Sequence, residues 1–186
     1  MKKVFVLFAA FVFLTLNQAF AYRATDFSSD AKIISAINML EQAGETDVLR
    51  NLQRHAIRVS FDDLSSVSYN SSKTYAVSTY NTYGTRVIMI NSIYKNAPTE
   101  QIACLIAHES CHVKRVADLE EETIATQKEA ATWIKLKNSS KVYPESRLTS
   151  RLDKISGLYM ASTNGNNLVQ QKIASNGFYR SQLGLN

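Results

Sequence analysis

Residues 101–113 constrain the fold most, because they place two histidines at the end of an almost entirely apolar run. Residues 101–107 read QIACLIA, residues 108–112 read HESCH, and a valine follows. Apolar residues at nearly every position predict a helix that is buried on most of its surface. Buried polar side chains need polar partners. The pattern therefore argues against two histidines that simply face solvent on such a helix.

The spacing of these histidines is typical of a metal site. Residues four apart lie on one face of a helix, so His108 and His112 can bind one metal ion from the same side. Glu109 then lies beside that ion, where a carboxylate can take a proton from an attacking water. The chain has three histidines in all, and two of them fall in this pattern. The motif indicates a zinc-dependent hydrolase, with Zn²⁺ as cofactor.

The motif helix is expected to run from about 98 to 115. Pro98 suits its first turn, where the missing N–H costs nothing, and Thr99 or Asn96 would lie near the cap. Cys104 and Cys111 lie seven residues apart on this helix, about 10 Å along its axis, so they cannot form a disulfide with each other. Cys111 also points roughly 100° away from the histidine face, which argues against a thiolate ligand.

A zinc site with a catalytic water needs a third protein ligand, and the next segment is rich in carboxylates. Residues 118–133 read DLEEETIATQKEAATW. Asp118 followed by Glu121 predicts a helix N-cap with its capping-box partner, and the helix is expected over 119–137. If the chain reverses at about 116–118, the two helices form an antiparallel hairpin. His112 then faces residues 121 and 122, which brings a carboxylate to the metal.

The combination of His108-Glu-Ser-Cys-His112 with Glu122-Thr-Ile-Ala125 resembles the gluzincin division of the zincin metallopeptidases. The resemblance covers about 85–137. It implies that His108, His112 and Glu122 bind zinc and that Glu109 is the general base. The interval from His112 to Glu122 is short for that family, and Thr126 stands where an Asp or Asn is often found.

Two other carboxylates compete with Glu122 for the third position. Glu121 is adjacent and would serve if the helix were rotated. Asp118 lies six residues after His112, which is the metzincin-like spacing, but that pattern turns the chain at a glycine and Arg115 occupies the position here. The ranking is Glu122, then Glu121, then Asp118. Glu129, two turns further along, is interpreted as a solvent-facing residue.

The remaining patterns predict an α+β fold, with about three short strands before the motif helix and further helices after it. In the family that the motif resembles, an edge strand borders the substrate cleft. A Ser/Asp/Asn-rich loop is expected at 62–73 and a hairpin turn at 81–84. The predicted helices cover 30–43, 46–55, 145–162 and 166–181, and the predicted strands cover 57–61, 74–80 and 85–90.

The N-terminus predicts export. Residues 1–21 combine Lys2 and Lys3, an apolar stretch and an Ala-Phe-Ala ending, which is typical of a secretory signal peptide. Residues 22–186 are then a single zincin-like domain in the periplasm or the medium. No later segment is long enough to span a membrane, so no stable membrane insertion is expected after cleavage. The mature segment carries 19 basic and 16 acidic residues without a basic cluster, which argues against a nucleic-acid partner.

The sequence therefore predicts an exported zinc metallopeptidase that acts on a peptide or protein of the cell envelope or the surroundings. The alternatives are a catalytically inactive zincin-like protein and a metal-free envelope-binding protein. Metallopeptidases often place a Tyr or His over the metal to stabilise the transition state. Tyr159, Tyr179 and His55 are the candidates here, although a core role is the more common one for tyrosines in a small domain.

Overall fold

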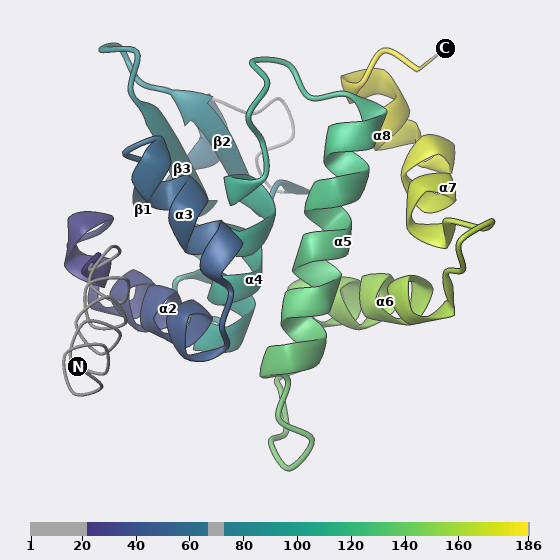
Figure 1. The fold of residues 1–186 in the computed structure, drawn as a ribbon, viewed down its shortest axis with the longest axis horizontal. Coiled ribbons are helices and arrows are strands. Elements are labelled where there is room, and N and C mark those ends of the chain that lie inside the picture. The colour runs from purple at the N-terminus through teal and green to yellow at the C-terminus, as the bar shows by residue number, and fades with distance from the viewer. Residues whose placement is uncertain (1–21, 67–72, 186) are drawn as a thin grey trace, which may run out of the picture.

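A three-stranded mixed sheet and a set of packed helices make up the computed structural model, which describes residues 22–66 and 73–185 (Figure 1). The strands are β1 (Arg58–Asp62), β2 (Ala76–Tyr80) and β3 (Arg86–Asn91), in the order β1-β3-β2. β3 is central, parallel to β1 and antiparallel to β2. The predicted α+β class is confirmed, and each predicted strand is found within two residues of its expected bounds.

The predicted hairpin joins β2 to β3. The side chain of Asn81 accepts hydrogen bonds from the backbone amides of Tyr83 and Thr85 at 3.0 and 2.9 Å. Gly84 has a φ of 74°, a conformation that costs glycine nothing and other residues more. These local bonds set the register in which Ala76 faces Ile90.

One edge of β2 pairs with no other strand among the described residues. The amide of Asn91 donates to the carbonyl of Tyr75, and the amide of Asn81 donates to that of Thr85. Because hydrogen-bonded pairs alternate along an antiparallel ladder, the odd-numbered residues of β2 bond to β3. The backbone groups of Ala76, Ser78 and Tyr80 therefore point away from the sheet.

The main core lies between the sheet and the N-terminal helices. α2 (Ala31–Gln42) is capped by Asp30, whose carboxylate accepts from the amides of Lys32 and Ile33, and α3 (Thr46–Arg54) follows. Short 3₁₀ turns cover Ala24–Asp26, Leu64–Ser66 and Ser92–Tyr94. α4 (Thr99–Ser110) packs against both α2 and the sheet. Fully buried side chains of this core include Ile33, Ile37, Leu40, Leu52, Ile88, Ile90, Ile102 and Ile106.

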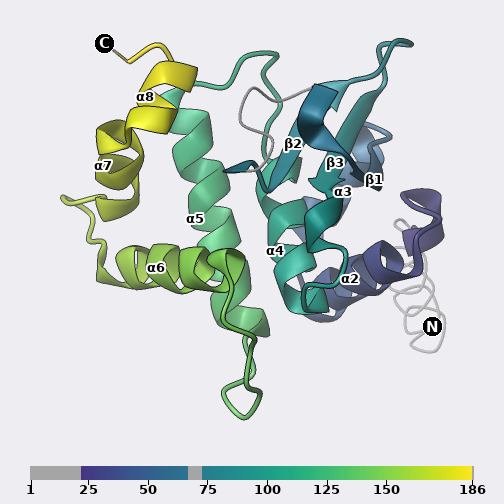
Figure 2. The same ribbon diagram turned by 180° about the vertical axis from the view of Figure 1, so that it is seen from behind.

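The second half of the domain is built on α5 (Leu119–Leu136), which lies beside α4. α6 (Arg147–Ala161), α7 (Leu168–Ser175) and α8 (Gly177–Gln182) follow. Figures 1 and 2 show these three helices on the side of α5 that faces away from the sheet. The prediction of one helix over 166–181 is wrong. Asn176 is extended, with ψ 120°, and its side chain caps a new helix by accepting from the amide of Phe178.

Some predictions fall on parts of the chain outside the described residues. The expected signal peptide, residues 1–21, is one, and most of the expected loop at 62–73 is another, since residues 67–72 are not described. Among the helices of 22–66 and 73–185, none combines the length and the apolar character that crossing a bilayer requires.

Candidate metal centre

The motif helix ends earlier than its sequence suggested. α4 begins after Pro98, which occupies the N-cap position, and it stops at Ser110, so the expected bounds of 98–115 are wrong at the C-terminal end. His112 therefore lies in the turn that follows the helix. The amides of Cys111 and His112 still bond back to the carbonyls of His108 and Glu109, and this tightened turn keeps the two histidines together.

Groups distant in the sequence satisfy the end of α4. Arg86 on β3 donates to the carbonyl of Glu109 at 3.2 Å, and Asn51 on α3 donates to the carbonyl of Ser110 at 3.2 Å. A cation at this position also interacts favourably with the negative end of the helix dipole. The carboxylate of Glu121 accepts the next two amides, those of Val113 and Lys114, at 2.8 and 2.9 Å. The helix stops because these donors bond to Glu121 rather than to helical carbonyls.

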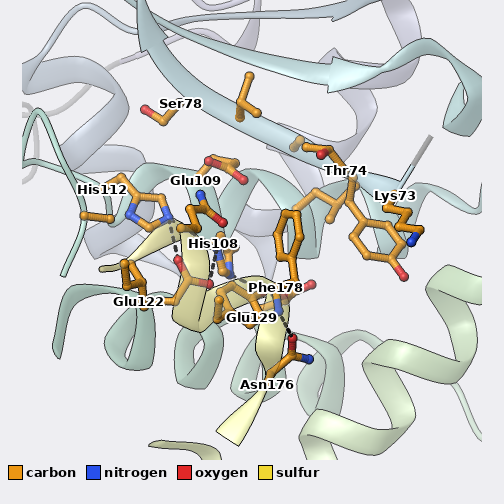
Figure 3. A pocket seen from close by; sticks show the side chains of 18 of the residues that line it. Lys73, Thr74, Ser78, His108, Glu109, His112, Glu122, Glu129, Asn176 and Phe178 are labelled. Atoms are coloured by element: carbon orange, nitrogen blue, oxygen red, sulfur yellow. Dashed lines mark hydrogen bonds and ion pairs between the residues drawn. The ribbon is translucent and has the colours of Figure 1, made fainter. Parts of the chain in front are cut away.

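Three ligand-type atoms from α4, the turn and α5 converge on one point (Figure 3). The Nε2 atoms of His108 and His112 are 3.3 Å apart. Oε1 of Glu122 lies 3.5 Å from Nε2 of His108, and Oε2 of the same carboxylate lies 3.6 Å from Nε2 of His112. His108 and Glu122 are buried, and His112 is partly buried.

These separations fit a metal ion. A tetrahedral ion that binds its ligand atoms at about 2.0–2.2 Å holds them roughly 3.3–3.6 Å from one another. The distance between the two histidine nitrogens and the distance from each of them to its nearer Glu122 oxygen lie in that range. Two imidazoles with one carboxylate form a donor set that suits zinc. Among the described residues, His108, His112 and Glu122 form a group whose ligand-type atoms all lie within 4.8 Å of one another. These are the three ligands that the sequence analysis ranks first.

Each histidine also has a carboxylate at its other ring nitrogen. Nδ1 of His108 lies 3.0 Å from Glu129, within ion-pair distance although not aligned as a hydrogen bond. Nδ1 of His112 lies 3.5 Å from Glu121. A carboxylate at Nδ1 favours the tautomer that carries its proton there. The lone pair of Nε2 is then left facing the point where the three ligand atoms meet.

Glu129 is a residue whose role the sequence interpretation got wrong. Its side chain has no exposure to solvent, and it forms an ion pair with Arg151 of α6. Burial raises the pKa of Glu129, but Arg151 and His108 outweigh that effect and hold the pKa at about 2. The seven-residue interval from Glu122 to Glu129 places both on one face of α5, which is the sequence signal that could have identified it.

The two competing carboxylates have other roles in this structure. Glu121 faces Nδ1 of His112 and holds the amides of the turn. Asp118 is exposed, forms an ion pair with Lys114 and accepts from the amide of Glu121 at 2.9 Å. The predicted cap of α5 is therefore confirmed, although the Glu121 side chain serves the preceding turn instead of returning to Asp118.

Glu109 lies beside the ligand cluster and borders a cleft of about 1110 Å³. Its side chain is buried, and burial raises the pKa of Glu109. The nearby histidines lower the pKa, and Glu122 and Glu129 raise it again. The unpaired edge of β2 forms the opposite wall, so Ser78 and Thr74 lie across the cleft from Glu122 (Figure 3).

The cluster itself favours a cation. Burial alone would lower the pKa of His108, but the carboxylates of Glu122, Glu129 and Glu109 outweigh it and raise the pKa to about 9. Three carboxylates within reach of one imidazole thus produce a negative local potential. A divalent cation at the convergence point would be attracted by that potential.

Of the three candidates for stabilising the transition state, one lines the cleft. Tyr179 of α8 lines it, and its hydroxyl accepts from Arg151 at 3.4 Å. Burial raises the pKa of Tyr179 to about 12. His55 and Tyr159 lie outside the lining of the cleft. Both cysteines are free, as expected within this chain, and Cys111 bonds to the carbonyl of Ala107 away from the ligand cluster.

No family model, curated protein or solved structure matches the chain.

Proposed function

We propose that the protein is a zinc-dependent metallopeptidase in which His108, His112 and Glu122 bind the metal. The observation that carries the proposal is the convergence of two imidazoles and one carboxylate. The Nε2 atoms of the histidines are 3.3 Å apart, and the two oxygens of Glu122 lie 3.5 and 3.6 Å from them. Structural zinc sites are usually closed by four protein ligands, whereas catalytic sites keep a position open for water. Three ligands that border a cleft match the catalytic arrangement.

Zinc bound there would make a coordinated water more acidic and polarise the carbonyl of a peptide bond. Glu109 supplies the proton transfers. Its carboxylate takes a proton from water as the water oxygen bonds to the carbonyl carbon. The same carboxyl then gives that proton to the amide nitrogen as the carbon–nitrogen bond breaks. Glu109 directly follows His108 on α4, and it lines the cleft together with the three candidate ligands.

The edge of β2 supports a peptide as the substrate. The outward backbone groups of Ala76, Ser78 and Tyr80 can pair with an extended chain, as strand-adding ligands do in other proteins. The cleft runs between that edge and the ligand cluster. A peptide bond held along β2 would therefore lie next to Glu109. Tyr179 is the remaining candidate for stabilising the oxyanion.

The first test is elemental analysis of zinc in the protein purified without chelators or affinity-tag histidines. We expect about one zinc per chain in both the wild type and the Glu109→Gln variant. The wild type should hydrolyse peptides, and the Glu109→Gln variant should not. Glu122→Ala should lose zinc, whereas Glu120→Ala, an exposed neighbour on α5, should keep it. Absence of zinc even after reconstitution would refute the proposal and favour a metal-free binding protein.

A further inference from the structure

The walls of the cleft carry an excess of positive charge. The acidic residues in its lining are Glu109, Glu122 and Glu129, all of which belong to the candidate metal centre. The described lining contains no other carboxylate side chain. Five basic residues line the same cleft, and they are Lys73, Lys114, Arg115, Arg147 and Arg151.

These basic residues lie toward the two ends of the edge strand. Lys73 precedes β2, and the guanidinium of Arg147 contacts the carbonyl of Lys73 at 3.5 Å. Arg115 borders a smaller hollow together with Ser78, Thr79 and Tyr80, at the other end of the strand. The seven-residue interval from Lys73 to Tyr80 spans roughly 23 Å in an extended chain. The cationic groups therefore bracket the strand along which a peptide would pair.

Some of these cations are already paired and others are open to a ligand. Arg151 is committed to Glu129, and Lys114 is paired with Asp118. The side chains of Lys73 and Arg115 are exposed, and neither forms an ion pair with any residue of 22–66 or 73–185. One open cation thus lies at each end of β2.

We propose that the cleft selects acidic peptides, with carboxylate side chains on both sides of the bond that is cut. An extended peptide paired with β2 would bring its flanking carboxylates to Lys73 at one end and to Arg115 at the other. Opposite charges arranged in this way fix the position of a ligand and speed its encounter. The inference deepens the proposed peptidase function and rests on it for the cleavage, but the recognition can be measured separately.

The test is peptide binding to the zinc-loaded Glu109→Gln protein, which is designed not to cut its ligand. Three fluorescent peptides of equal length and apolar content would carry Glu, Gln or Lys at the same flanking positions. We expect the Glu peptide to bind about three- to thirtyfold more tightly than the Gln peptide, on the scale of two exposed ion pairs. The Lys peptide should bind most weakly, and the differences should shrink at high salt.

Charge-reversed variants locate the effect. Lys73→Glu combined with Arg115→Glu should abolish or invert the order of the three peptides. Arg54→Glu combined with Lys172→Glu changes the net charge by the same amount on exposed positions outside the cleft, and it should leave the order unchanged. Each single cleft variant should remove about half of the preference on a logarithmic scale.

Equal binding of the three peptides would overturn the inference, as would loss of the preference in the control variant. Tighter binding of a single-stranded oligonucleotide than of the Glu peptide would also overturn it, in favour of a nucleic-acid ligand. Wild-type cleavage separates this inference from the proposed function. Equal cleavage of all three peptides would refute the acidic preference alone, and selective binding without cleavage by the wild type would refute the peptidase alone.

Discussion

The two candidate ligand histidines have the same chemistry but are held in place in opposite ways. His108 lies on the buried face of α4, and its Nδ1 faces Glu129, which is paired in turn with Arg151 on a third helix. His112 lies beyond the end of α4, and its Nδ1 faces Glu121. Glu121 also accepts two backbone amides of the same turn. One ligand is fixed by a buried charge network, and the other by a locally capped turn.

This difference determines how strongly the side chains that hold each histidine contribute to the stability of the domain. A fully buried carboxylate is tolerated only while its cation remains, because an uncompensated buried charge is expensive. The partners of His108 therefore contribute to the stability of the whole domain. The partners of His112 stabilise a turn of a few residues, so changes there should affect metal binding more selectively. The predictions below test this contrast, from the largest expected effect to the smallest.

Arg151→Met should have the largest effect, because it leaves Glu129 buried without its cation. We expect the free energy of unfolding to fall by about 3–5 kcal/mol, measured by urea denaturation of the zinc-free protein. Arg147→Met is the matched control. Arg147 lies one turn earlier on α6 over the same Tyr75 ring, but it is exposed and does not contact Glu129. A loss no larger than in the control would show that the buried pair does not stabilise the fold.

The sequence predicted the locally encoded features of this region and missed those that depend on tertiary contacts. The cap by Asp118 and the hairpin at Asn81 follow from side chains that bond within a few residues, so sequence patterns identify them. The early end of α4 depends on Arg86 and Glu121, which meet the helix only after folding.

The side chains around the candidate metal centre show the same limit. His108 and His112 are predicted from their helical spacing, and Glu122 from the expected helical hairpin together with the family resemblance. The sequence analysis interprets Glu129 as a solvent-facing residue, because its cation, Arg151, is 22 residues away in the sequence. No periodic pattern links the two residues, and a carboxylate on a helix is usually exposed. A charged side chain is stable in a core only when the folded chain places an oppositely charged partner beside it. The pattern of a single segment does not show that partner.

Glu129→Gln should weaken zinc binding by about 10–100-fold, the usual cost of removing an outer carboxylate from a ligating histidine. The amide keeps the shape of the side chain but no longer holds the charge that orients His108. Competition with a fluorescent chelator would measure the affinity, with Glu120→Gln on the exposed face of α5 as the control. An unchanged affinity would mean that Glu129 serves the fold alone.

Glu121→Gln should weaken zinc binding less, by about tenfold at most, because the contact with Nδ1 of His112 is longer, at 3.5 Å. The amide oxygen can still accept the amides of Val113 and Lys114. Glu121→Ala removes those bonds as well, and we expect it to lower the free energy of unfolding by about 1–2 kcal/mol more. The contrast between the two variants separates the charge from the cap. Equal behaviour of Gln and Ala would refute the claim that Glu121 secures the turn.

The smallest effect is expected for Thr126→Val, which tests how the third ligand is held. The Thr126 hydroxyl lies 3.5 Å from the Glu122 carboxylate, one turn away on the same helix. A hydrogen bond of this length is weak, and Glu122 is also oriented by the two histidines that it faces. We therefore expect less than about a threefold loss of zinc affinity, well below the Glu129→Gln effect. Valine keeps the shape of threonine, so packing stays constant and the difference reports the hydroxyl alone. A loss as large as that of Glu129→Gln would mean that Glu122 depends on Thr126 as strongly as His108 depends on Glu129. The contrast between local and tertiary support would then not hold for Glu122, the third candidate ligand.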